Sequence, residues 1–239
     1  MTEFFYDLHI HSCLSPCGDM EMTPNNIAGM AFIKGLKIIA LTDHNTARNV
    51  PALIKAAAKY DLTVIPGMEL TTQEEVHVLC LFSDAEDALA FDRFVYDHLI
   101  KVKNRTEFFG RQVQMNENDE PVAEEENLLI NATDISFDSV FDIVTDFKGI
   151  MIPAHLDKDT TSLISNLGLI PPDPGFTCAE VNDPAKLQGL LKAHPYLKRC
   201  RIISNSDAHY LQDISEPVHS LLLDSEHPHP KEILEMLIS

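Results

Sequence analysis

The sequence lacks any uninterrupted apolar stretch near the roughly 18 residues that indicate a membrane-spanning helix. Its first residues, Met1 to Tyr6, have neither the basic start nor the long apolar run of a signal peptide. Cysteine is scarce and odd in number, with five residues in 239, and its spacing is not that of a small disulfide-linked domain. These absences predict a cytoplasmic protein with no membrane partner and no disulfide framework.

Positive charge is scarce as well. The chain has 18 Lys and Arg residues against 37 Asp and Glu, which gives a formal net charge of −19 at pH 7. An acidic surface repels long polyanions, because binding to a phosphate backbone normally requires clustered Lys and Arg. We therefore expect no duplex DNA partner. The excess of carboxylates fits simple solubility or bound cations, and the count alone leaves both interpretations and the oligomeric state open.

Short apolar, β-branched segments alternate with helical patterns along most of the chain. The predicted strands cover residues 4–10, 37–42, 63–66, 76–82, 150–154, 178–181, 201–204 and 218–223. Helices are predicted between them, for example over residues 24–34 and 51–60, and each begins with a proline that suits the first helical turn. This alternation predicts an α/β fold with parallel strands, and eight candidate strands are enough for a barrel.

The region of residues 84–147 interrupts this alternation. It contains a helical stripe of apolar residues between Phe91 and Val102, followed by a polar and acidic stretch over residues 116–127 that we expect to be an exposed loop. There is no internal repeat and no clear linker. We expect one domain over residues 1–239, with an inserted helical and loop region at about residues 84–147.

Histidines and acidic residues lie at the ends of several predicted strands. They are His9 and His11, Asp43 and His44, Glu69, His155, and Asp207 and His209, while His77 lies within the fourth predicted strand. Because the carboxyl ends of parallel barrel strands open on one face, these side chains are expected to converge. The other histidines lack such a position and are interpreted as structural or solvated: His98, His194, His219, His227 and His229.

Imidazole nitrogens and carboxylate oxygens are ligands for Zn²⁺, Mn²⁺ and Fe²⁺. There are too many candidate ligands for one tetrahedral ion, so we expect two or more ions, bridged by a carboxylate such as Glu69. A cluster of this kind lowers the pKa of a bound water and stabilises the attacking and leaving oxygens of a phosphoryl group. A single strand-end histidine is weak support for such a site, and the interpretation depends on the joint position of all of them.

Six segments of the chain resemble the motifs of the polymerase and histidinol phosphatase (PHP) superfamily, in the same order. They are Asp-Leu-His-Ile-His-Ser at residues 7–12, the segments at residues 35–45, 65–69, 76–79 and 152–155, and Ser-Asp-Ala-His at residues 206–209. The resemblance implies a distorted seven-stranded (β/α) barrel, similar to a TIM barrel, with a trinuclear metal site at the carboxyl ends of the strands.

The resemblance also implies a ligand set. One ion is held by His9, His11, Glu69 and Asp207, a second by Glu69, His77 and His155, and a third by Asp19, His44 and His209. Asp43 is implied to orient a ligand histidine. The chain departs from the family in one place. The family usually has Ser-Asp-Gly after the His-x-His motif, whereas this chain has Ser15-Pro16, and the acid Asp19 follows later.

The resulting prediction is a phosphoesterase with two to three divalent ions (Zn, Mn or Fe), in which metal-bound hydroxide attacks a phosphate ester. Glu69, Asp207 and His209 are the predicted catalytic residues, with Asp207 or His209 moving a proton, and Arg48 and Lys158 are the candidates for binding phosphate. The expected substrate is small: a phosphorylated metabolite, a nucleotide or a short oligonucleotide.

Two alternatives stay open. An amidohydrolase also begins with His-x-His and ends with a strand-end Asp, but its four-His arrangement with a strand Lys is not recognisable here. The second alternative is a PHP module that binds metal without catalysis, as in some polymerases. It fits less well, because nine candidate ligands are intact and no polymerase is attached.

Overall fold

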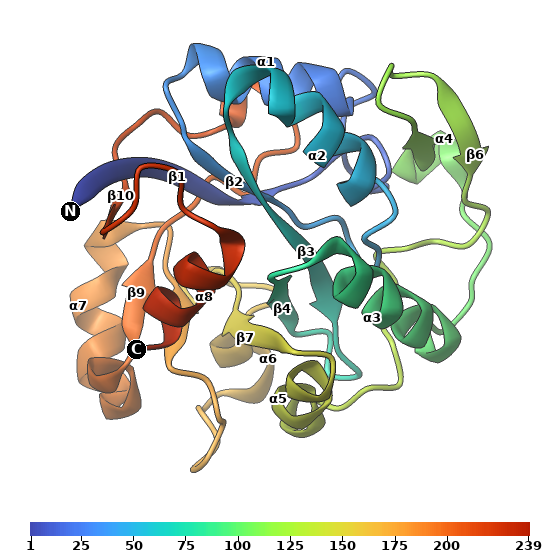
Figure 1. Cartoon of the computed structure of the whole chain (residues 1–239). Coiled ribbons are helices and arrows are strands. Elements are labelled where there is room, and N and C mark those ends of the chain that lie inside the picture. Colours follow the sequence, from blue (N-terminus) through green and yellow to red (C-terminus); the bar gives the residue numbers. More distant parts are fainter.

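The computed structural model describes residues 1–239 and has an α/β fold (Figure 1). The main sheet contains, in spatial order, β10 (Ser220–Leu223), β1 (Thr2–Ile10), β2 (Ile38–Leu41), β3 (Thr63–Thr71), β4 (His77–Phe82) and β7 (Gly149–Pro153). Two further strands, β8 (Cys178–Glu180) and β9 (Arg201–Ile203), form a parallel pair. All eight strands predicted from the sequence are therefore present.

The strands do not form a regular barrel of seven parallel strands. Strands β1, β2 and β3 are parallel, but β4 runs antiparallel to both of its neighbours, and β10 runs antiparallel to β1. The sheet instead curls into a half-barrel. The reason lies in the connection from β3 to β4, which spans only residues 72–76. Such a short link allows a hairpin, whereas a parallel crossover needs a dozen residues or more.

The β8–β9 pair lies next to both ends of the curled sheet. Leu156, just after β7, donates its backbone N–H to the carbonyl of Glu180 in β8 at 2.9 Å. On the other side, Ala208 forms a parallel bridge with Ile10 at the end of β1. The carboxyl ends of β7, β8, β9 and β1 are thereby brought to the same end of the fold, where the candidate site lies.

Helices pack on both faces of the sheet. Helices α1 (Pro24–Ile33), α2 (Val50–Ala57), α3 (Ala85–His98) and α5 (Phe137–Asp146) share the larger apolar core with the convex face. Helix α8 (Pro230–Ile238) packs on the concave face, where Ile233 and Leu237 join a second core with Leu79 and Ile152 (Figure 1). The short helix α6 (Leu163–Leu167) and helix α7 (Pro184–Ala193) flank β8 in the sequence. None of the helices is both long and apolar enough to cross a lipid bilayer.

The region 84–147 contains α3, the short helix α4 (Thr106–Phe109), a hairpin of β5 (Val113–Met115) and β6 (Pro121–Glu124), and α5. The prediction of a plain loop over residues 116–127 was wrong, because β6 lies within it. The hairpin packs against the loop that follows β1: Val113 donates its backbone N–H to the carbonyl of Cys13 at 2.9 Å. Figure 1 shows α4 and β6 together at one edge of the molecule.

Candidate metal centre

An irregularity in β1 directs His9, and His11 just after the strand, into the concave side of the sheet. Tyr6 and Leu8 belong to the core on the concave face, whereas Ile10 belongs to the core on the convex face. Strict alternation would place Leu8 and Ile10 on one face. The pairing of β1 with β2 shifts between Asp7 and Ile10, as in a β-bulge, and this shift brings the histidines next to Ile10 onto the concave side.

Glu69 and His77 reach the same space by ordinary alternation. On β3, Met68 and Leu70 face the convex core, so Glu69 faces the concave side. On β4, Leu79 belongs to the concave core, and His77 lies two residues before it on the same face. Because β4 is reversed, its first residue lies at the end of the sheet where β3 finishes. The sequence placed His77 within a parallel strand, and the hairpin gives the same convergence by a different route.

Glu69 lies at the centre of the group and is 1% exposed. Five imidazoles surround its carboxylate within 3.4 Å: His44 at 2.9 Å, His77 at 3.0 Å, His155 at 3.1 Å, His9 at 3.3 Å and His11 at 3.4 Å. Asp207 extends the cluster, since its Oδ1 atom lies 3.3 Å from His9 and 3.2 Å from His11. Residues separated by almost two hundred positions therefore meet at one carboxylate.

Three overlapping groups in this cluster have ligand atoms close enough to share a metal ion. They are His9, His11, Glu69 and Asp207; His44, Glu69 and His77; and His11, His44 and His209. His155 lies outside these three groups but contacts Glu69 through its Nε2 atom. The structure thus brings together eight of the nine predicted ligands, and their role as ligands stays a prediction.

Asp19 is the ninth, and it does not join the cluster. Its Oδ1 atom accepts a hydrogen bond from the backbone N–H of Glu21 at 2.8 Å, which closes a local turn. Its own backbone N–H donates to the carbonyl of His209 at 2.9 Å. The loop after the His-x-His motif therefore brings the Asp19 backbone to the site, while the carboxylate is engaged in its own turn.

The chemistry of the donors fits divalent cations. Three buried polar atoms of the cluster have no hydrogen-bond partner: His44 Nδ1, Glu69 Oε2 and His155 Nδ1. His44 Nδ1 and Glu69 Oε2 lie 2.9 Å apart without the alignment of a hydrogen bond. Leaving such atoms unpaired is costly, and a cation between a nitrogen and an oxygen donor satisfies both. Nitrogen and oxygen donors of this kind suit Zn²⁺, Mn²⁺ or Fe²⁺.

Metal binding requires neutral imidazoles and ionised carboxylates, and most pKa shifts in the cluster suit it. His9 is the exception: burial alone would lower its pKa, but the carboxylates of Glu180, Asp207 and Glu69 raise it well above its usual value. Burial and the neighbouring imidazoles of His209 and His44 lower the pKa of His11 well below its usual value, and burial lowers the pKa of His44 to about 4. Burial alone would raise the pKa of Glu69, but the imidazoles of His77 and His9 hold it well below its usual value. Burial would likewise raise the pKa of Asp207, but the imidazole of His9 holds it below its usual value.

Asp43 acts on the cluster through Ser15. Asp43 is fully buried and accepts hydrogen bonds from the backbone N–H and hydroxyl of Ser12 and, at 2.7 Å, from the hydroxyl of Ser15. The Ser15 oxygen is in turn 3.0 Å from His11 Nδ1 and can accept its proton. His11 therefore directs Nε2 toward Glu69 and Asp207. The sequence predicted that Asp43 orients a ligand histidine, and its route to His11 is indirect.

Glu180 is the main residue that the sequence analysis missed. It ends β8 and is fully buried, and its carboxylate lies 3.1 Å from His9 Nδ1. It also accepts the backbone N–H of His155 at 2.7 Å and the side-chain amide of Asn205 at 2.7 Å. Glu180 meets the same criterion as the other predicted residues, an acid at a strand end, and that signal was present in the segment of residues 178–181.

The two candidate phosphate-binding residues lie in different environments. Lys158 forms an ion pair with Asp207 Oδ2, so its ammonium group lies beside the cluster. Arg48 is paired with Glu125 at 2.9 Å and packs over the ring of Tyr96, in the inserted region. Lys158 thus lies beside the cluster and Arg48 lies against the inserted region, and phosphate binding by either residue stays a prediction.

Backbone strain accompanies the site. His155 and Asp207 have positive φ angles of 31° and 54°, and Asn45, next to His44, has 51°. Residues other than glycine adopt this region rarely and at some cost in free energy, and such positions concentrate at functional sites. The side-chain amide of Asn45 donates to the carbonyls of Leu129 and Asn131, so the inserted region holds this turn in place.

Two solved structures with the same fold are informative. One matches almost all of this chain, and the other is a complex with a nucleic-acid substrate. A putative metal-dependent phosphoesterase of Bifidobacterium adolescentis has a TM-score of 0.61 and 17% identity, and the match covers 97% of this chain and 94% of the other. Endonuclease Q in complex with a 27-mer duplex substrate containing an abasic lesion has a TM-score of 0.60 and 20% identity, and the match covers 87% of this chain and 49% of the other. At these identities the likeness shows a shared fold.

A relative identified by its sequence is also a nuclease. A 5'-3' exoribonuclease of Haemophilus influenzae is 32% identical over 82 residues, which are 33% of this chain and 29% of that protein. The match to each curated relative covers only 28% to 54% of that relative's length.

These proteins correct the expectation about partners. We expected a small substrate and no duplex DNA, from the net charge of −19, and that expectation was wrong: proteins that share this fold or these motifs act on DNA duplex and on RNA. Net charge is a poor guide because it averages the whole surface. Here several acidic residues, such as Glu69 and Asp207, lie inside a cluster that suits cations, and bound cations reverse the local charge that a phosphate meets.

The family itself is shown by the sequence. Residues 7–169, more than half of the chain, match the PHP domain. The match covers the strands that supply His9, His11, His44, Glu69 and His77, and it ends after His155. It confirms the prediction of a PHP-type hydrolase that depends on metal. The chain belongs to the PHP domain family.

Proposed function

We propose that this protein is a metal-dependent phosphoesterase that hydrolyses a phosphoester bond in a nucleic-acid strand. The observation that carries the proposal is the position of Glu69, a buried carboxylate within 3.4 Å of five imidazoles. A buried cluster of this kind has no structural need to exist, because apolar residues would stabilise the fold better. The similarity to an exoribonuclease supports a nucleic-acid substrate.

The proposed cofactor is a set of two to three divalent ions, Zn²⁺, Mn²⁺ or Fe²⁺. Their proposed holders are the three overlapping groups of the cluster, with His155 completing the group of His77. When bound, such ions lower the pKa of a water molecule and neutralise the oxygens of a phosphoryl group. Asp19 is not among the proposed holders, because its carboxylate is engaged with Glu21.

The chain's own residues bind the phosphate and orient the histidines of the cluster. Lys158 places an ammonium group beside Asp207, where it can donate to a phosphate oxygen. Glu180 and the pair of Ser15 and Asp43 hold His9 and His11 with Nε2 toward the cluster. Asp207 Oδ2 is the group that we assign to proton transfer with the attacking water, whereas the ring of His209 is assigned to an ion. His209 Nδ1 donates to the carbonyl of Asp207 at 2.8 Å, which leaves its Nε2 available.

We also propose that residues 1–239 act as one domain and that the region of residues 84–147 is an insertion that supports the site. Two contacts support this role. The β5–β6 hairpin bonds to Cys13 in the loop after His11, and the carbonyls of Leu129 and Asn131 hold the Asn45 side chain next to His44. The insertion thus braces both loops that follow the first two strands.

The test is cleavage of end-labelled single strands of RNA and DNA, and of a DNA duplex, by protein that was stripped with a chelator and then loaded with Mn²⁺ or Zn²⁺. We expect metal-dependent release of shorter products, and loss of that release in Glu69→Gln. The proposal fails if the loaded protein cleaves no strand, or if Glu69→Gln cleaves as fast as the wild type. Hydrolysis of amides or lactones, with no cleavage of phosphoesters, would favour the amidohydrolase alternative.

A further inference from the structure

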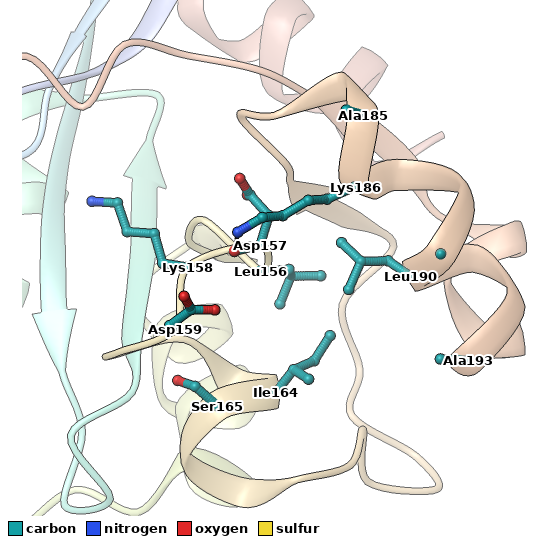
Figure 2. Close-up of a pocket in the computed structure, with 11 residues that line it drawn as sticks. Leu156, Asp157, Lys158, Asp159, Ile164, Ser165, Ala185, Lys186, Leu190 and Ala193 are labelled. Atoms are coloured by element: carbon teal, nitrogen blue, oxygen red, sulfur yellow. Dashed lines mark hydrogen bonds between the residues drawn. The ribbon is translucent and has the colours of Figure 1, made fainter.

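A groove lies beside the metal centre, between the segment that follows His155 and the helices α6 and α7 (Figure 2). Its volume is about 670 Å³. Binding sites for small organic groups commonly have volumes of about 300–1,000 Å³ and are mostly apolar, with a few polar groups that set orientation. The groove fits the volume criterion, and it is lined by five hydrophobic residues and by charged ones that include Asp157, Lys158 and Asp159. No role has yet been given to it.

One wall of the groove is apolar. Leu156 follows His155 directly and is 1% exposed, so its side chain forms a fixed floor. Ile164 of α6 and Leu190 of α7 face the same space, and Figure 2 shows the three side chains gathered around it. Ala185 and Ala193 of α7 continue the wall with small side chains. Such a surface suits the flat face of an aromatic ring system.

Hydrogen bonds hold the polar side of the groove in place. The Asp157 carboxylate accepts the backbone N–H groups of Asn182 and Asp183 at 2.9 and 3.0 Å. Lys186 donates to the carbonyl of Asp157 at 2.7 Å, so the start of α7 is tied to the loop after His155. The groove is therefore formed before any ligand binds, which reduces the entropic cost of binding.

Lys158 connects the groove to the metal centre. Its stem lines the groove, while its ammonium group pairs with Asp207 of the cluster. Figure 2 shows the Lys158 side chain extending away from Leu156 and Leu190. A ligand that fills the apolar part of the groove and continues past Lys158 therefore meets a cation first and the cluster next. Along this path a ligand meets the apolar wall first, the ammonium group of Lys158 second and the metal centre last.

We propose that this groove binds the nucleoside adjacent to the scissile phosphate of a single nucleic-acid strand, an inference that rests on the proposed phosphoesterase function. The base lies against Leu156, Ile164 and Leu190, and Lys158 donates to the phosphate. A nucleoside is the occupant that fits this order, because its flat base and its anionic phosphate are joined by a short sugar. Enzymes that act on a separated nucleotide also hold its base between apolar side chains.

Gly189 gives a clean way to close the groove. It lies in α7, lines the groove, and a Cβ atom built there meets no other atom within 4 Å. Gly189→Phe therefore adds a ring to the groove without displacing the core, and replacing a helical glycine does not weaken the helix. Gln188→Phe is the matched control, since Gln188 is the exposed neighbour on the same helix and does not line the groove. Ala193→Phe closes the groove from a second position.

The experiment compares two probes in metal-loaded protein: a dinucleotide, and dimethyl phosphate, a diester with neither a nucleoside nor an aromatic ring. The ratio of their kcat/KM values is the readout. We expect the ratio to fall by about 10-fold or more in Gly189→Phe and Ala193→Phe, mainly through a higher KM for the dinucleotide, and to stay at the wild-type value in Gln188→Phe. Thermal unfolding confirms that each variant is folded. A wild-type ratio in both groove variants would overturn the proposal.

A binding measurement distinguishes failure of the groove proposal from failure of the proposed phosphoesterase function. Fluorescence anisotropy of a short labelled single strand reports binding whether or not hydrolysis follows. Weaker binding by Gly189→Phe than by Gln188→Phe supports the groove, even if the wild type cleaves nothing and the phosphoesterase function is wrong. Equal binding by the wild type and Gly189→Phe contradicts the groove, even if the wild type cleaves the strand.

Discussion

His9 Nδ1 lies 3.1 Å from both carboxylate oxygens of Glu180, and both side chains are fully buried. With its proton on Nδ1, His9 donates to Glu180 and directs Nε2 toward Glu69 and Asp207, each 3.3 Å away. A carboxylate behind a histidine in this way fixes the ring and makes it a better metal ligand. Glu180 also bonds to the backbone of His155, so one residue orients two sides of the cluster.

Glu180→Gln tests this arrangement. Gln keeps the size of the side chain but removes the charge, so we expect the affinity for Zn²⁺ to fall by about 10- to 100-fold, the range measured for such partners of metal ligands. Competition with a chromophoric chelator measures the affinity without relying on turnover. Glu124→Gln is the control, because Glu124 forms only an exposed ion pair with Arg111. Equal affinities in the wild type and Glu180→Gln would show that His9 needs no partner.

Asp19→Asn tests a point on which the family motif and the geometry differ. The resemblance assigns Asp19 to the ion shared with His44 and His209, whereas its carboxylate bonds to Glu21. We expect metal content, measured by elemental analysis, to be unchanged in Asp19→Asn and to fall in His209→Ala. Loss of an ion from Asp19→Asn equal to the loss from His209→Ala would restore Asp19 to the ligand set.

Lys158→Met removes the ammonium group beside Asp207 and keeps most of the stem. We expect kcat/KM for a phosphodiester to fall by about 10-fold or more, because a charge-assisted hydrogen bond to the phosphate is lost. Metal content should not fall, since removing a cation from Asp207 does not disfavour other cations there. Lys148→Met is the control, as Lys148 pairs with Asp87 at the surface. Equal kcat/KM values in the two variants would remove Lys158 from the site.

Glu69→Gln is expected to be the most damaging conservative substitution. The carboxylate contacts five imidazoles, and the proposed ions share its charge. We expect turnover to fall by at least about 100-fold, the scale seen when an electrostatic element of an active site is removed. His98→Ala is the control, because His98 is half-exposed and pairs only with Asp134. Similar turnover in the two variants would contradict the position of the site.

The sequence was sufficient to locate most of the cluster, because strand ends are recognisable from short apolar runs and the polar residues after them stand out. His9, His11, His44, Glu69 and Asp207 were identified in this way. The direction of β4 could not be identified from the sequence, because apolar alternation is the same for a strand of either direction. The structure shows a link of only residues 72–76 between the two strands, whereas the predicted strand ended at residue 66 and so made this link look longer.

Local conformation accounts for the remaining differences. The shift in β1 pairing between Asp7 and Ile10 leaves no mark in residue type, yet it decides which face His9 occupies. Asp19 is close to the site in sequence, but a turn with Glu21 engages its carboxylate. Glu180 ends a strand of three residues, and its contact with His9 joins positions 171 residues apart. Such long-range pairs depend on the curl of the whole sheet.

The central claim is that this cluster holds metal ions that the reaction requires. Elemental analysis of the purified protein, combined with cleavage of a labelled strand before and after chelation, tests it most directly. We predict about two to three divalent ions per chain, loss of cleavage when they are removed, and recovery with Mn²⁺ or Zn²⁺. Cleavage at the full rate by metal-free protein would contradict the account.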